Sequence, residues 1–129
     1  EISLGLVGSE MCIRDSSHGT EWLDQVVAYI KGNVDFTETY LKEHIPAIKM
    51  IRPQASYLIF LDCRALGLNQ EELNRLFVED AHLALNDGTT FGKEGEGFMR
   101  LNVACPRSVL RQALDQIKEA YELKHDTIA

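Results

Sequence analysis

The alternating run from Phe98 to Cys105 constrains the fold more than any other feature of this 129-residue sequence. Successive residues of a strand point to opposite faces, so a strand here would collect four apolar side chains on one face. They are Met99, Leu101, Val103 and Cys105. Pro106 ends the run, and an amphipathic helix with an apolar stripe from Val109 to Tyr121 is expected to follow. Together they favour two layers, with the helix packed on a sheet.

The first half of the sequence predicts a long helix and a strand. Apolar residues recur at helical spacing from Thr20, the expected N-cap, to about Ile45. Gly32-Asn33 is a weak point, where Asp35 with Glu38 could cap a second helix. We expect one long helix, because the apolar stripe continues across this point. The run SYLIFLD, residues 56–62, is typical of a buried strand.

The middle of the chain predicts a helix and a loop. Asn69 and Glu72 have the spacing of a capping box, and the helix they open would bury four apolar residues. These are Leu73, Leu76, Phe77 and Ala81. His82–Leu85 could form a short strand, and the four glycines of residues 86–97 indicate a loop. We therefore expect an α+β domain whose helices pack on a small, mostly antiparallel sheet.

Composition excludes several classes of function. The net charge of −7 argues against nucleic-acid binding, which needs a clustered basic surface. The three cysteines show no CxxC spacing, which argues against a zinc site or disulfide framework and for a reducing compartment. The four histidines form no i, i+4 ligand pair, and no apolar run approaches the ~20 residues of a membrane span. We expect a cytoplasmic protein without metal, nucleic-acid or membrane partners.

Arg100 is the strongest candidate for chemistry. It lies mid-strand on the face opposite the predicted core, and burying an arginine there is costly without an anionic partner. One interpretation is a structural ion pair with Asp62 or Glu96, which is the commoner outcome for such residues. The other is a bidentate site for the carboxylate of a ligand. The residues alone leave both open.

Three stretches carry a resemblance to a known family. Residues 56–68 (SYLIFLDCRALGL), 77–91 (FVEDAHLALNDGTTF) and 95–107 (GEGFMRLNVACPR) resemble the C-terminal part of class I/II aminotransferases. These are pyridoxal-phosphate (PLP) enzymes of fold type I. The stretches look most like the branch of cystathionine β-lyases and C–S lyases related to maltose-regulon modulator proteins. Residues 21–33 (EWLDQVVAYIKGN) resemble the helix that joins the large and small domains there.

The resemblance implies a homodimeric parent enzyme that uses PLP on an amino-acid substrate. It implies that Arg100 binds the substrate's α-carboxylate, and that loss of the Cα proton precedes expulsion of a sulfur leaving group from Cβ. The family's Schiff-base lysine lies in a serine-rich stretch of the large domain. None of six lysines here has that context: Lys31, Lys42, Lys49, Lys93, Lys118 and Lys124. We therefore expect no catalytic or cofactor-binding residue in this chain, no covalently bound PLP and no turnover by the chain alone.

The resemblance also divides the chain. Residues 1–16 resemble a translated sequencing adapter around SEMCIRDS, and we expect an artefactual or disordered leader there. Residues 17–53 would form the interdomain helix and a connection, 54–124 the small domain and 125–129 a tail. Two other interpretations stay open: the small domain of an aminotransferase, and a free-standing α+β ligand-binding or interaction module. A fragment should leave apolar surface open along Trp22–Ile45, and a module should cover it.

Overall fold

The computed structural model describes residues 19–128, with side chains described as far as residue 124. The leader expected at residues 1–16 lies outside this part of the chain. The predicted long helix is confirmed as α2, Thr20–His44, which is continuous through Gly32-Asn33. Gly19 rather than Thr20 is its N-cap. No second helix starts at Asp35 and Glu38, whose carboxylates instead bind the guanidinium of Arg52.

A four-stranded antiparallel sheet forms the centre of the fold, in the order β1-β2-β4-β3. Its strands are β1 Lys49–Ile51, β2 Leu58–Asp62, β3 Asn86–Asp87 and β4 Phe98–Asn102. The predicted antiparallel α+β class is confirmed, although β1 was not expected. The strand proposed at His82–Leu85 is wrong: His82 has a φ of 55°, and the Leu83 N–H donates to the carbonyl of Phe77.

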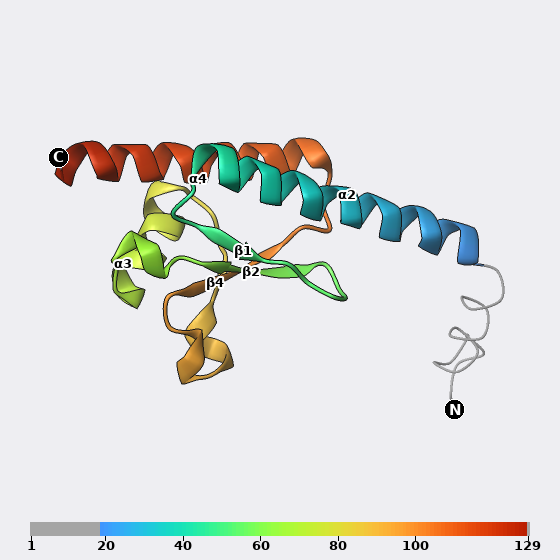
Figure 1. Ribbon diagram of the computed structural model, residues 1–129, viewed down its shortest axis with the longest axis horizontal. Helices are drawn as coiled ribbons and strands as arrows, with labels where there is room; N and C mark the ends of the chain where they lie inside the picture. The colour runs from blue at the N-terminus through green and yellow to red at the C-terminus, as the bar shows by residue number, and fades with distance from the viewer. Residues whose placement is uncertain (1–18, 129) are drawn as a thin grey trace, which may run out of the picture.

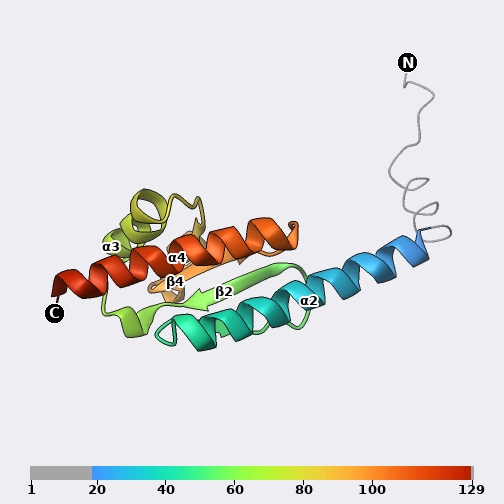
Figure 2. The same cartoon turned by 90° about the horizontal axis from the view of Figure 1, so that it is seen from above.

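The helical segments surround this sheet. In α3 the capping box between Asn69 and Glu72 is confirmed. The bounds are η1 Arg64–Leu66, α3 Gln70–Arg75, η2 Leu76–Asp80, η3 Gly88–Phe91, η4 Lys93–Gly95 and α4 Arg107–Ile128. Helices α2 and α4 lie side by side over one face of the sheet, while η3 and η4 project from the opposite side (Figure 1). Seen from above, the first turns of α2 extend past the sheet (Figure 2).

One core joins these layers. The predicted strand face is confirmed for Met99, Leu101 and Val103, which are buried, whereas Cys105 is half-buried. The predicted stripe of α4 is confirmed at its centre by Leu110, Leu114, Ile117 and Ala120. Val109 was expected on that stripe but is exposed. The core also contains Leu41 of α2 and Ile45, which directly follows that helix, so it is continuous across the expected boundary between residues 53 and 54.

Asn33 anchors the middle of α2 to the end of β4. The side chain is fully buried, and its Nδ2 donates to the carbonyl oxygens of Val103 at 2.7 Å and Cys105 at 2.9 Å. Buried carbonyls need such partners.

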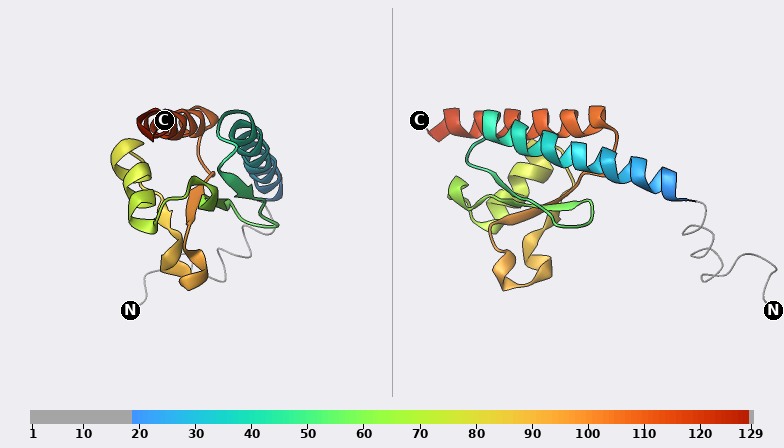
Figure 3. Two further views of the ribbon diagram at one scale, coloured as in Figure 1. Left: turned by 60° about the vertical axis from the view of Figure 1, so that its left-hand side comes forward. Right: turned by 45° about the vertical axis from the view of Figure 1, so that its right-hand side comes forward.

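The end-on view shows α2 and α4 against the sheet, with α3 and η2 closing its flank (Figure 3). Within residues 19–128, no helix combines the length and apolarity needed to cross a bilayer.

Candidate functional site

Arg100 lies on the face of β4 that points away from α2 and α4. Its neighbours Met99 and Leu101 enter the core, so alternation turns Arg100 outward, as predicted. Phe60 of β2 and Asn86 of β3 are its direct cross-strand partners. Because cross-strand partners share one face of a sheet, these three side chains form a row beneath the η3 and η4 turns.

Two side chains contact the guanidinium. Nη2 donates to Oδ1 of Asn86 at 3.0 Å, and Cζ lies 4.3 Å from the ring centroid of Phe91 in η3. The Phe91 ring also meets Phe60 edge-on, with centroids 5.8 Å apart and an interplanar angle of 86°. Nε is buried and has no acceptor among the described residues.

The expected acidic partner of Arg100 is not found in the described part of the chain. Asp62 pairs with Arg64 at 2.7 Å, and hydrogen bonds from that guanidinium lower the pKa of the Asp62 carboxyl. No ion pair of 4.0 Å or less joins Arg100 to Glu96 or to any other described acid. Among the described residues, the guanidinium therefore has no ion-pair partner, and its Nε has no acceptor.

Asp87 holds the loop that carries Phe91. Its carboxylate accepts from the amides of Gln70 at 2.8 Å and Asn74 at 2.5 Å, and from the backbone N–H and hydroxyl of Thr89. Burial raises the pKa of Asp87, but the hydrogen bonds from Asn74, Thr89 and Gln70 outweigh burial and leave that pKa below its ordinary value. Gln70 Oε1 also accepts from the N–H of Gly97, so α3 braces both ends of the loop.

Sequence reasoning found Arg100 but missed Asn86 and Phe91. Both fall in a segment assigned to a loop, and their contacts depend on the pairing of β3 with β4. One signal was available. Phe91 is an aromatic residue with Gly92 directly after it, in a loop where polar residues and glycine predominate. An aromatic residue in such a loop often packs against another side chain.

The curated relatives identify the chain. It is 42% identical over 104 residues to cystathionine β-lyase PatB of Bacillus subtilis and 35% identical over 96 residues to protein MalY of Escherichia coli. The alignments cover 81% and 74% of this chain but only 27% and 25% of those proteins. The chain belongs to the PLP fold-type I family of aminotransferases and cystathionine β-lyases. No family model matches it.

The solved structures agree with this family. Cystalysin of Treponema denticola, which contains PLP, superimposes on 85% of this chain with a TM-score of 0.82 and 26% identity. The superposition covers 28% of cystalysin. The chain thus spans little more than a quarter of the length of the PLP enzymes that it matches.

The described residues do not fit the covalent attachment of PLP. A Schiff-base lysine works with a shifted pKa, which needs a buried setting. Here Lys31, Lys42, Lys49 and Lys93 are exposed, and the remaining two lysines are half-exposed. Within the described residues, no group of three histidine, cysteine or acidic side chains could hold a metal ion. Arg100, with one hydrogen bond and no ion pair among the described residues, remains the candidate binding residue.

The two described cysteines do not form a reactive centre. Cys63 is buried, and burial raises the pKa of its thiol to about 12. Burial also raises the pKa of Cys105. The thiolate is the nucleophilic form, so both thiols are poor nucleophiles at neutral pH.

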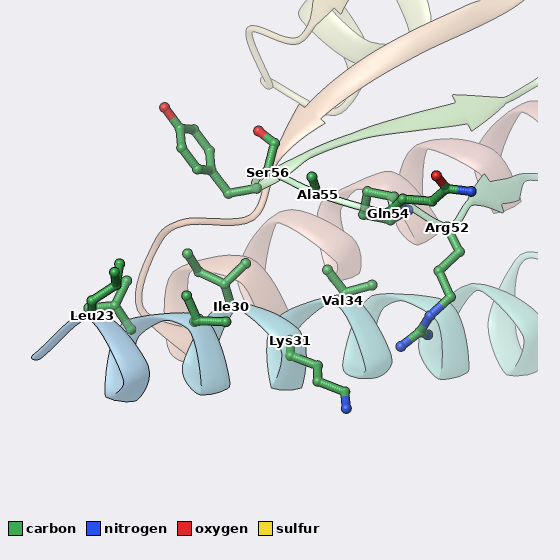
Figure 4. A pocket seen from close by; sticks show the side chains of 12 residues that line it. Leu23, Ile30, Lys31, Val34, Arg52, Gln54, Ala55 and Ser56 are labelled. Atoms are coloured by element: carbon green, nitrogen blue, oxygen red, sulfur yellow. The ribbon is translucent and has the colours of Figure 1, made fainter. Parts of the chain in front are cut away.

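An apolar groove lies on the helical side of the sheet. The first turns of α2 and the turn at residues 52–57 enclose about 720 Å³. Figure 4 shows Leu23, Ile30 and Val34 facing this turn. The apolar surface continues over Trp22 and Val27, which are 69% and 55% exposed. The start of α2 is thus open, as expected of a fragment, whereas its second half is packed into the core.

Proposed function

We propose that this chain is the C-terminal small-domain segment of a PLP-dependent C–S β-lyase of the cystathionine β-lyase type. In this proposal Arg100 binds the α-carboxylate of the amino-acid substrate. The observation that carries it is the guanidinium itself. It stands mid-strand with no acid in reach among the described residues and with one hydrogen bond, to Asn86.

A carboxylate suits this arginine in geometry as well as charge. The planar guanidinium presents N–H groups in a fork that matches the two oxygens of a carboxylate. An ion pair of this kind fixes both the position and the rotation of the bound amino acid. Reaction rate depends on such orientation, because it decides which Cα bond is aligned to break.

The proposed reaction divides its tasks between this segment and the rest of the enzyme. PLP, held elsewhere in the full-length enzyme, would supply the electron sink for the electron pair left at Cα when its proton departs. The Cβ–S bond then breaks with its electron pair leaving on sulfur, and an S-substituted L-cysteine and one water together give a thiol, pyruvate and ammonia. Arg100 takes no proton in this scheme and acts by binding and orientation.

Substitution of Arg100 in the full-length enzyme tests its role. Arg100→Ala should lower kcat/KM for L-cystathionine, because it removes one partner of a charge pair. The expected loss of transition-state stabilisation is about 2–5 kcal/mol. Arg100→Lys should recover part of this loss, since lysine keeps the charge but lacks the fork. An unchanged kcat/KM in Arg100→Ala contradicts the assignment.

Product analysis tests the reaction class. Incubating the full-length enzyme with L-cystathionine should release a thiol and pyruvate in equal amounts, with no added keto acid. An aminotransferase would instead need a keto-acid acceptor and would leave the sulfur attached to carbon. Turnover that depends on a keto acid and releases no thiol overturns the lyase proposal.

A further inference from the structure

Two neighbours limit how the Arg100 guanidinium can turn. Asn86 accepts one Nη2 hydrogen, and this bond sets the rotation of the group within its own plane. Phe91 lies against the guanidinium at 4.3 Å from Cζ, and this contact sets the orientation of the plane. A free arginine side chain samples many rotamers, so these contacts fix the direction in which its remaining N–H groups point.

Both neighbours are themselves held in place. Asn86 is paired with Arg100 in the β3–β4 ladder, and Asp87 beside it is anchored by Gln70 and Asn74 of α3. Phe91 is 50% exposed, yet its ring rests edge-on against Phe60 of β2. The guanidinium is thus braced from the sheet on one side and from η3 on the other.

We propose that Asn86 and Phe91 are positioning residues, which hold the Arg100 guanidinium ready for a substrate carboxylate. This inference rests on the proposed function of Arg100. Neither residue is assigned contact with the substrate. They act through Arg100, by limiting its motion before the carboxylate arrives, so that less freedom is lost on binding.

The aromatic ring has a specific role in this arrangement. Aliphatic carbon of similar bulk would cover the guanidinium but would lack the negative ring face that attracts it. Phe91→Leu in the full-length enzyme should therefore raise KM for L-cystathionine on the order of tenfold, with kcat within about threefold. Phe91→Trp keeps a ring and should stay within about threefold of the wild type in both constants. Val109→Ala, at an exposed site on α4, is the matched control and should leave both constants unchanged.

Asn86 allows a second test that depends on charge. Asn86→Asp preserves shape but puts a carboxylate against Nη2, where it would pair with Arg100 and compete with the substrate. Asn86→Asp should therefore raise KM more than Asn86→Ala does, without lowering the melting temperature. A purely structural role for Asn86 gives the opposite order, because alanine loses the hydrogen bond and aspartate keeps it.

Coupling to Arg100 separates this inference from the function on which it rests. If Phe91 acts through Arg100, Phe91→Leu should have no further effect on kcat/KM in an Arg100→Ala background. An equal loss in both backgrounds, or unchanged kinetics of Phe91→Leu and Asn86→Asp in the wild-type background, overturns the positioning role alone. Unchanged kinetics of Arg100→Ala overturns the proposed function and the positioning role with it.

Discussion

Nε of Arg107, the first residue of α4, donates a hydrogen bond to Oδ1 of Asn33 in the middle of α2 at 2.6 Å. The two amide hydrogens of Asn33 already bind the carbonyls of Val103 and Cys105. One buried side chain therefore satisfies three groups of the connection between β4 and α4. Two further hydrogen bonds cross between α2 and α4, from the Arg107 N–H to the Tyr29 hydroxyl and from the Tyr40 hydroxyl to Asp115.

Removing the three hydrogen bonds of the Asn33 side chain should destabilise the fold. Asn33→Ala leaves two carbonyls without their partner and a guanidinium without its acceptor, and we expect a loss of about 3 kcal/mol in the free energy of unfolding. Urea unfolding of the chain measures it. Gln112→Ala, at an exposed site on α4, is the control. A loss for Asn33→Ala below about 0.5 kcal/mol, the range of ordinary surface changes, would contradict this stabilising role of Asn33.

The Asp87 carboxylate should make stability depend on pH. Its folded pKa lies below the ordinary value, so its ionised form stabilises the fold above about pH 4, and this contribution is lost as pH falls through the folded pKa. We expect Asp87→Asn to unfold more easily than the wild type at pH 7. The difference should shrink as pH falls below about 4. Parallel curves of stability against pH for the two proteins would count against this explanation.

The turns η3 and η4 should tolerate no side chain where they meet. A Cβ at Gly95 would lie 2.0 Å from the carbonyl oxygen of Gly88, so Gly95→Ala must push the turns apart. We expect a loss of about 1–3 kcal/mol in the free energy of unfolding. Gly67→Asn is the control, because its added Cβ meets no atom within 4 Å and asparagine tolerates the φ of 68°. Equal stability of Gly95→Ala and the wild type would show that the turns are loosely packed.

Cys63 should resist alkylation in the folded chain. With a pKa of about 12, only about one thiol in 10⁴ is ionised at pH 8, and the side chain is also buried. Iodoacetamide treatment followed by peptide mass spectrometry should leave the Cys63 peptide unmodified and label it fully in urea. Rapid labelling under folding conditions would mean that β2 opens readily.

The exposed apolar surface at the start of α2 should bind a hydrophobic dye. The isolated chain should enhance the fluorescence of anilinonaphthalene sulfonate, and Leu23→Lys with Val27→Lys should reduce it, since both side chains line the groove. The paired change Val78→Lys with Leu123→Lys, at exposed sites elsewhere, should not. A wild-type chain that neither binds dye nor aggregates would favour a free-standing module over a fragment.

The longer helices and strands could be predicted because their signals are local. Alternation placed Met99 and Leu101 of β4, and Val103 directly after it, in the core. The spacing of Asn69 and Glu72 located the start of α3. These patterns depend on residues a few positions apart, which the sequence displays directly.

The surroundings of Arg100 could not be predicted, because they are set by pairing at a distance. Asn86 reaches Arg100 through a two-residue strand, and Phe91 through a short 3₁₀ turn, neither of which has a periodic signal. Asn33 was misread for a related reason. Its low helix propensity suggested a weak point, but its amide is satisfied by residues some 70 positions away.

Helix α2 is attached to the rest of the fold by hydrogen bonds near its middle, at Asn33. At about 1.5 Å per residue its 25 residues extend roughly 37 Å, and Asn33 attaches it near the midpoint to the segment that directly follows β4. The first turns of the helix, before Asn33, expose the apolar side chains of Trp22, Leu23 and Val27. A partner that binds the exposed first turns would therefore contact a helix that is hydrogen-bonded directly to the segment following β4.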